Sequence, residues 1–499
     1  MSQPSNDLLE ISQLAFLDET EAMRALLAHV EKLSVLEAPI MARAKGWTQQ
    51  IRKDGIGHGV EAFLNAYGLD TTEGIALMCL AEALLRIPDS NTADALIRDT
   101  FEGRDWASYT GSGDSWLVNL SSWGLLLTGK VVDFGQDAQA GVLKVLKNLV
   151  AKTGEPIIRE ALKKAMKLIG GQFVLGETVR EALEQSPPYL KRGYRFSYDI
   201  LGEGARSDEQ ALGYVKSYRA GIIRIGKTIP EGTPLFEAPG ISVKLSALHP
   251  RYSLVKHERV MNELLPRLSE ILLQAKEANI AVAIDAEEAS RLDIELMLLE
   301  RLVADKRFAG WNGIGFVVQA YQKRAFYVID WLAKLARKHG RVIPLRLVKG
   351  AYWDSEIKWA QLSGLESYPV FTRKENTDVS YLACADKILS YREAFYPQFA
   401  THNARTVSSI MQLAEQYGWA KKNYEFQRLH GMGEALHNMV VRDVASRIYA
   451  PVGAHKDLLA YLIRRLLENG ANSSFVHLLM DDSKTPEEIL ADPVAATQL

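Results

Sequence analysis

The sequence predicts an α/β protein, namely a (β/α)8 barrel of the TIM type preceded by an all-helical N-terminal region. From about residue 190 onward, short apolar or β-branched runs alternate with amphipathic stretches. This alternation is typical of parallel strands joined by crossover helices. Eight such units in about 280 residues match the usual size of this barrel, about 250 residues. A doubly wound open sheet is the alternative architecture.

The region before the barrel has a helical pattern. Leu26, Val30 and Leu33 recur at steps of three and four residues, as on one face of an amphipathic helix. We expect a helical arm and α-domain over 1–150, a helical linker over 151–190, the barrel over 191–480 and a tail over 481–499. The expected strands lie within Tyr194–Leu201, Gly240–Leu245, Ala281–Glu287, Gly313–Tyr321, Ile343–Trp353, Phe399–Ala404, Tyr424–Gly431 and Arg447–Gly453.

Composition limits the location and the partners. The 59 Lys and Arg residues nearly balance the 61 Asp and Glu residues, and the net charge of −2 argues against nucleic acid as the main partner. Cys79 and Cys384 have apolar or small neighbours and are expected to be buried thiols, as in a reducing cytoplasm. The N-terminus MSQPSNDLLE has no export signal. The apolar stretch from Gly74 is too short and too charged to span a bilayer. We therefore expect a cytoplasmic protein and leave peripheral membrane contact open.

Polar side chains occur near the ends of the expected strands, where the chemistry of such barrels collects. Burying them costs several kcal/mol unless they find partners, so a ligand with several polar groups is the economical explanation. The residues concerned are Lys244, Asp285, Gln319, Arg346, Lys349, His402, Gln427 and Tyr449.

Basic residues near two of these ends predict an anion site. Arg346 and Lys349 flank one strand end, and His402 and Asn403 follow another. The loop with Thr372, Arg373 and Lys374 lies between them and would complete a diphosphate cradle made of side chains, although such a loop alone is typical of solvated surface. No P-loop occurs, and GMGEAL lacks the third glycine of the dinucleotide fingerprint.

The helix expected over 456–469 is apolar nearly all round yet contains Arg464 and Arg465. Tyr461 and Glu468 share their face. Two adjacent buried guanidinium groups suit a carboxylate held bidentately. The alternative is an internal ion pair with Glu468 and with Asp285 or Glu287. For Lys244, an ion pair with Asp285 and a role as an imine-forming nucleophile both remain open.

The motifs closely resemble the proline dehydrogenase domain of the bacterial proline utilisation A (PutA) flavoproteins, from about residue 170 to 480. The resemblance is carried by PGISVKLSALHPRYS, IDAEE, GWNGIGFVVQAYQKR, RLVKGAYWDSEIK, YPVFTRKENTDVSYLACA, FATHNA, YEFQRLHGMGE, YAPVGAHK and LLAYLIRRLLENGAN. It implies a distorted (β/α)8 barrel that follows an N-terminal arm and α-domain. It also implies non-covalent FAD and oxidation of L-proline to Δ1-pyrroline-5-carboxylate by hydride transfer to flavin N5, the first step of proline catabolism. A membrane quinone would receive the electrons.

The resemblance also implies roles for individual residues. Arg464, Arg465 and Lys244 would bind the proline carboxylate, with Asp285 supporting them, and Arg346 would lie beside flavin N5. The proline ring would lie among Tyr352, Leu429, Tyr449 and Tyr461. The flavin ring, ribityl, diphosphate or adenosine would be held by Asp285, Gln319, Arg346, Val348, Lys349, Gly350, Thr372, Arg373, Lys374, His402, Asn403 and Glu468. No metal site is expected.

The chain departs from the family pattern in two respects. The aldehyde dehydrogenase half of many members is absent, so either this is the first half of a longer protein or the partner enzyme is separate. The first 50 residues show no basic strand of a ribbon-helix-helix module, and we expect no DNA binding. Two other functional classes compete with a proline dehydrogenase: a lyase or aldolase using Lys244 or Lys349, and a non-catalytic binding or regulatory protein.

Overall fold

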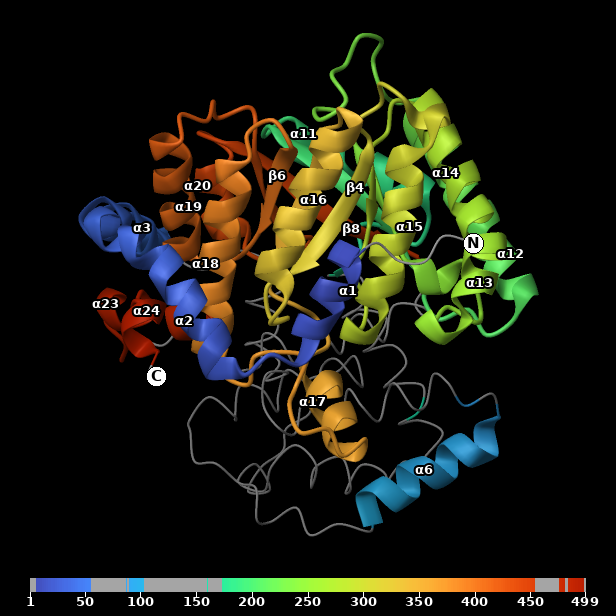
Figure 1. Ribbon diagram of the computed structural model, residues 1–499, viewed down its shortest axis with the longest axis horizontal. Helices are drawn as coiled ribbons and strands as arrows, with labels where there is room; N and C mark the ends of the chain where they lie inside the picture. The colour runs from blue at the N-terminus through green and yellow to red at the C-terminus, as the bar shows by residue number, and fades with distance from the viewer. Residues whose placement is uncertain are drawn as a thin grey trace, which may run out of the picture.

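The computed structural model describes residues 6–54, 87, 89–102, 159, 173–453, 475–480 and 483–497. Its centre is a closed barrel of eight parallel strands that neighbour one another in chain order (Figure 1). The first strand pairs with the last, with Tyr198 opposite Ala450. The predicted (β/α)8 barrel is therefore confirmed, and closure excludes the doubly wound open sheet.

The strands are short and buried on both faces, as expected when helices surround a parallel barrel. Every residue of IGFVVQ in β4, for example, is buried. Their bounds are β1 (Tyr194–Ile200), β2 (Gly240–Val243), β3 (Val282–Ile284), β4 (Ile314–Gln319), β5 (Ile343–Val348), β6 (Phe395–Ala400), β7 (Glu425–Leu429) and β8 (Ala445–Val452).

Helices follow the strands and begin and end at recognisable signals. Ser207 caps α12 by accepting from the backbone N–H of Gln210, and Gly340 ends α16 in the left-handed conformation. The helices from the first barrel strand onward are α12 (Asp208–Gly226), α13 (His257–Arg259), α14 (Leu265–Glu277), α15 (Leu292–Ala304), α16 (Ala325–His339), α17 (Trp353–Leu362), α18 (Lys374–Ser390), α19 (Ala404–Gln416) and α20 (Glu434–Val440). Short 3-10 or π segments are η5 (Leu245–Ala247), η6 (Leu254–Lys256), η7 (Val260–Leu264), η8 (Ala289–Arg291) and η9 (Lys306–Phe308).

One expected strand was wrongly placed. The run Phe399–Ala404 contains only the last two residues of β6, and it continues through a turn into α19. The strand begins at Phe395 and includes Pro397, which lies opposite Leu345 of β5. Proline cannot donate to the strand ladder, so this segment lacks the usual signal of a central strand.

The N-terminal arm consists of α1 (Asn6–Gln13), η1 (Leu14–Phe16), α2 (Glu19–Val30), η2 (Glu31–Leu36) and α3 (Glu37–Asp54). It runs along the outside of the barrel, where α2 contacts α18 and α3 contacts α19 (Figure 1). Leu26, Val30 and Leu33 are buried, so the predicted apolar face is confirmed. Within the rest of the predicted helical region, the described helices are α6 (Ser90–Glu102), α10 (Val179–Gln185) and α11 (Pro187–Leu190).

The C-terminal segment returns to the arm. It contains α22 (Phe475–Met480), α23 (Pro486–Ile489) and α24 (Pro493–Ala496), and both α22 and α23 contact α3. Arg405 of α19 joins the two ends of the chain, because it pairs with Glu37 of the arm at 2.6 Å and with Asp492 of the tail at 3.2 Å. The domain boundaries set from sequence stay predictions.

Two smaller expectations concern the cysteines and the membrane. Cys384 is a buried free thiol, as predicted, whereas Cys79 lies outside the described residues. The apolar stretch from Gly74 lies there as well. Among the helices that the structure describes, none is long and apolar enough to cross a membrane.

Candidate active site

The predicted site residues Lys244, Asp285, Arg346 and Tyr449 meet inside the barrel toward the carboxyl ends of its strands, together with Asp199, which was not predicted. The ammonium of Lys244, just after β2, lies 2.7 Å from Asp199 of β1 and 3.5 Å from Asp285, just after β3. The Tyr449 hydroxyl of β8 donates to Asp285 at 2.8 Å and lies 3.4 Å from Lys244 Nζ. We call Asp199, Lys244, Asp285, Arg346 and Tyr449 the upper cluster, where upper refers to the carboxyl ends of the strands.

Arg346 of β5 is the second cation of the upper cluster. Its guanidinium donates to Asp285 Oδ1 at 2.7 Å and to the hydroxyl groups of Ser242 and Ser197 at 3.1 and 3.2 Å. The Tyr449 ring lies 5.1 Å from the guanidinium carbon. The cation is therefore fixed in one orientation inside the barrel. The strand ends at Val348, so Lys349 follows it, as the spacing predicted.

The electrostatics of Lys244 decide between its two predicted roles. Burial alone would lower the pKa of Lys244, but the negative charges of Asp199 and Asp285 raise this pKa well above its usual value. An imine-forming lysine needs the neutral amine. The ion-pair prediction is thus confirmed by geometry, and the lyase alternative loses its support at Lys244.

The upper cluster leaves two buried polar atoms unsatisfied. Asp199 Oδ2 and Arg346 Nε have no hydrogen-bond partner within the described residues. An unsatisfied buried polar atom costs about 1–3 kcal/mol. Asp199 itself is fully buried. Such atoms are expected where a bound molecule supplies the missing partners.

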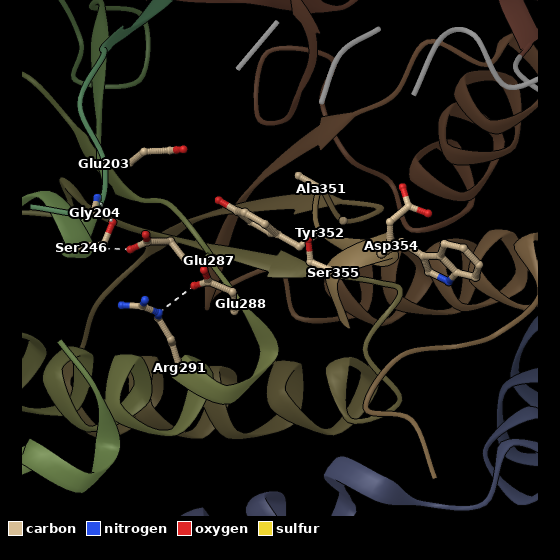
Figure 2. Close-up of a pocket in the computed structure, with 12 residues that line it drawn as sticks. Glu203, Gly204, Ser246, Glu287, Glu288, Arg291, Ala351, Tyr352, Asp354 and Ser355 are labelled. Carbon is tan, nitrogen blue, oxygen red and sulfur yellow. Dashed lines mark hydrogen bonds and ion pairs between the residues drawn. The ribbon is translucent and has the colours of Figure 1, made fainter. Parts of the chain in front are cut away.

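A cavity of about 510 Å³ opens at the same end of the barrel. It is lined by loops that follow β1, β2, β3 and β5, and Figure 2 shows Tyr352 pointing across it toward Glu287. Of the predicted site residues, Tyr352 and Gly350 line this cavity. Gly350 has φ +143°, and a Cβ there would lie 2.5 Å from the Tyr321 ring, so only glycine fits at this turn.

Glu287 connects three of the strand ends. Its carboxylate accepts from the backbone N–H of Ser246 at 2.9 Å, and Ser246 Oγ accepts from the N–H of Gly204 at 3.0 Å. The backbone carbonyl of Glu287 accepts from the side-chain amide of Gln319 at 2.8 Å. Gln319 is therefore buried and oriented at the end of β4, and its predicted contact with a cofactor stays a prediction.

Lys349 and Lys374 meet at Asp378 of α18. Lys349 pairs with one carboxylate oxygen, and Lys374 lies 3.2 Å from the other. Burial alone would raise the pKa of Asp378, but the two lysine charges lower it. Two ammonium groups on one carboxylate leave an excess of one positive charge, so this group retains the capacity to attract an anion.

Thr372 and Arg373 precede α18 on an exposed loop. Thr372 donates its backbone N–H and its hydroxyl to Glu19 of the arm, at 3.0 and 2.8 Å. Arg373 lies 3.9 Å from Glu375. Neither residue contacts the upper cluster in the contacts described, so the structure places these predicted residues in a separate group with Lys374.

His402 and Leu429 meet at the ends of β6 and β7, where His402 Nε2 accepts from the backbone N–H of Leu429 at 3.2 Å. Asn403 caps α19 through its side-chain oxygen, which accepts from Thr406 N–H at 3.0 Å. This cap gives Asn403 a structural role that the sequence analysis did not propose. Val348 is half-buried at the end of β5.

The remaining predicted site residues, Tyr461, Arg464, Arg465 and Glu468, lie outside the described residues, and their roles stay predictions. Several residues of the site were missed. Asp199 could have been found, because it is a carboxylate near the end of an otherwise mostly apolar strand, YRFSYDI. Asp378 and Glu19 gave no such signal, because both occur in helices where charged residues are ordinary.

The chemistry of these groups fits the FAD that the family resemblance implies. The upper cluster offers a fixed cation and unsatisfied buried atoms to a polar ring, and the lysines around Asp378 offer positive charge to a diphosphate. Arg346, Lys349, Lys374 and Gly350 all lie at the same end of the barrel.

Comparison with known proteins points to one family. The family model for proline dehydrogenase matches residues 182–478. The bifunctional protein PutA of Escherichia coli (strain K12) is 50% identical over 495 residues, covering 96% of this chain and 37% of that protein. A proline dehydrogenase of Deinococcus radiodurans is 25% identical over 322 residues, covering 64% of this chain and 93% of that protein.

Solved structures agree with this result. A PutA variant from Bradyrhizobium japonicum superposes with a TM-score of 0.73 and 44% identity, covering 96% of this chain and 48% of that one. The chain thus spans less than half the length of these PutA relatives.

A second family model, named for a DNA-binding domain of proline dehydrogenase, matches residues 59–173. This match speaks against our expectation that the chain does not bind DNA, and most of these residues lie outside those that the structure describes. The first family model covers more than half of the chain and contains the whole upper cluster. The chain therefore belongs to the proline dehydrogenase family.

Proposed function

We propose that this chain is an FAD-dependent proline dehydrogenase that oxidises L-proline to Δ1-pyrroline-5-carboxylate and passes the electrons to a membrane quinone. The observation that carries the proposal is the proline dehydrogenase family match across the barrel. The position of the upper cluster supports it, because its charges are buried at the strand ends where barrel enzymes place their chemistry.

Bound FAD would supply the acceptor for the hydride that leaves the ring carbon next to the proline nitrogen. The protein itself would hold charged side chains in fixed positions around the reacting groups. Arg346 is held by Asp285, Ser242 and Ser197, so its positive charge needs no reorganisation when negative charge develops nearby. Burial keeps water away from Arg346 and strengthens this electrostatic effect.

Substrate binding would use the other predicted residues. Lys244 remains an ammonium group and would attract the proline carboxylate together with Arg464 and Arg465. Tyr352, Leu429, Tyr449 and Tyr461 would surround the apolar ring. The Tyr449 phenol stays neutral, because burial and the charges of Asp199 and Asp285 raise its pKa well above its usual value. It can therefore donate its hydroxyl hydrogen to Asp285 throughout the physiological pH range.

The proposal is tested by the flavin spectrum. Protein purified after supplementation with FAD should be yellow, and anaerobic L-proline should bleach it while producing a cyclic imine that NMR can identify. D-proline serves as the matched control, because the same atoms arrive in the wrong orientation. Protein that takes up no FAD, or whose bound flavin L-proline leaves oxidised, contradicts the proposal.

DNA binding is a second candidate function, favoured by the family match over residues 59–173 alone. A gel-shift assay tests it with specific and scrambled DNA at several salt concentrations. Tight, salt-sensitive and sequence-specific binding supports this function, and equal weak binding to both DNA molecules contradicts it.

A further inference from the structure

One residue of the N-terminal arm reaches the loop that the proposed function assigns to the cofactor. Glu19, the first residue of α2, accepts from the backbone N–H of Thr372 at 3.0 Å and from its hydroxyl at 2.8 Å. The same carboxylate accepts from the side-chain amide of Asn376 at 2.6 Å. These three donors lie more than 350 residues away in sequence, at the start of α18.

The start of α18 has no side-chain cap of its own. Arg373 occupies the capping position in an extended conformation, and its side chain makes no capping hydrogen bond. Glu19 supplies a carboxylate there instead, where the positive end of the helix favours a negative charge. An element of the arm therefore fixes the residues on both sides of Arg373.

The burial of Asn376 indicates that its contact with Glu19 belongs to the folded structure of this loop. Its side chain is 5% exposed, so water cannot readily replace the carboxylate that its amide group contacts. Its other polar atom, Oδ1, is buried and has no hydrogen-bond partner in the described part of the chain. The contact with Glu19 orients this unsatisfied oxygen, because the amide nitrogen is already committed.

We propose that Glu19 is a positioning residue for the cofactor: it holds Thr372 and Asn376 in the conformation in which the loop before α18 binds FAD. The inference rests on the proposed function, since the loop matters here only as a cofactor loop. It assigns to the arm a task in the active site of the barrel in addition to covering α18. The described hydrogen bonds of Glu19 go to Thr372 and Asn376 and to no residue of the upper cluster.

The opposite role would be competition, in which Glu19 occupies the Thr372 donors and must leave before FAD can bind. The burial of Asn376 argues against this role, because departure of Glu19 would leave a buried amide group unpaired. The two roles predict opposite changes in FAD affinity when Glu19 is neutralised, so one measurement separates them.

The arm provides a matched control. Glu37, at the start of α3, accepts from Arg405 of α19 at 2.9 and 2.6 Å. It is a carboxylate of the same arm that is bonded to a different barrel helix, and none of its described contacts is to the cofactor loop. Glu37→Gln therefore reports the effect of loosening the arm in general.

The experiment measures the FAD dissociation constant of apo-protein by quenching of flavin fluorescence. We expect Glu19→Gln to weaken FAD binding roughly 5- to 30-fold and Glu19→Ala to weaken it further, as for lost hydrogen bonds to a charged group. Glu37→Gln should leave the constant within about twofold of the original chain. Thermal unfolding of each apo-protein establishes that the variants are folded.

Unchanged or tighter FAD binding by folded Glu19→Gln overturns the inference, and so does an equal loss of affinity in Glu37→Gln. If Glu19→Ala does not fold, Glu19→Gln alone decides, because it keeps the size of the side chain. Failure of the unaltered chain to bind FAD is a different result, which contradicts the proposed function.

Discussion

The two ends of the barrel each bury an arginine against a carboxylate, but they complete these ion pairs differently. At the amino ends of the strands, Arg447 of β8 pairs with Glu425 of β7 at 2.6 Å. At the carboxyl ends, Arg346 pairs with Asp285 at 2.7 Å. All four residues are at least nine-tenths buried. The difference lies in how many of the polar atoms find partners inside the protein.

Arg447 makes full use of its guanidinium. Besides Glu425, it donates to the backbone carbonyl groups of Phe196, Phe236 and Ala238 at 2.6 to 2.9 Å. Glu425 also accepts from Gln398, Gln427 and Tyr396. A buried ion pair with its donors satisfied in this way contributes to a defined structure and offers little to a ligand.

Arg346, by contrast, keeps Nε unsatisfied, and Asp199 beside it keeps one oxygen unsatisfied, within the part of the chain that the structure describes. Both ends hold buried ion pairs, so the presence of charge and burial alone does not identify the site. Incomplete hydrogen bonding among the described residues does, because the missing partners must come from outside that set, such as a bound molecule, water or a residue that the structure does not describe.

The largest expected effect comes from breaking the ion pair at the amino ends. Arg447→Met removes the closer cation of the buried Glu425 carboxylate and leaves only Arg195, at 3.6 Å, so it should lower the free energy of unfolding by about 3–5 kcal/mol. Urea denaturation followed by circular dichroism measures this change. Arg447→Lys restores the charge but not the fork of donors and should recover part of the loss. A loss below about 1 kcal/mol in Arg447→Met would show that the two ends do not differ as argued.

Arg346→Met should lower the rate of flavin reduction strongly but the free energy of unfolding only slightly. Asp285 keeps Lys244 and Tyr449 as partners, so the stability loss should be smaller than in Arg447→Met. The rate of flavin reduction by L-proline should fall roughly 10²- to 10³-fold, as when a fixed donor at a developing charge is removed. Stopped-flow absorbance measures this rate, with FAD content as the control. Normal reduction kinetics in a folded, flavin-loaded variant would remove Arg346 from the reaction.

The sequence was most informative where a regular period or a meeting of strand ends decides the geometry. The barrel could be predicted because eight apolar runs alternate with amphipathic stretches. The contact between Lys244 and Asp285 could be predicted because both follow neighbouring parallel strands, whose carboxyl ends lie at the same side.

Pairings between distant surface elements could not be predicted in this way. Glu19 and Thr372 meet only because α2 lies across α18, and nothing in the local pattern of either segment specifies that crossing. Asp378 looked like an ordinary charged residue on a helix, since only Lys374 precedes it by one helical turn, whereas Lys349 reaches it from the end of β5. Periodicity indicates which face of an element is buried, but not which charged residue meets it from elsewhere.

A smaller effect is expected from the pKa values of two buried carboxyl groups, of which one pairs with an arginine and the other makes no such pair within the described ranges. Burial would raise the pKa of Glu425, but the charge of Arg447 lowers it. Glu295 of α15 is also buried, yet burial and the charge of Glu287 raise its pKa to about 8. A raised carboxyl pKa favours the protonated fold, so the stabilisation is complete below the ordinary value of about 4.5 and is lost as the pH rises toward 8.

Glu295→Gln should remove that pH dependence. In the original chain this carboxyl group should lower the free energy of unfolding by about 2 kcal/mol between pH 6 and pH 8, since each proton linked to unfolding changes it by about 1.4 kcal/mol per pH unit. The glutamine retains an acceptor for the Tyr252 hydroxyl, which lies 3.3 Å from Glu295. Urea denaturation at both pH values measures the difference. An equal decline in the variant and the original chain would mean that Glu295 is ionised in the fold, although no ion pair to it occurs among the described residues.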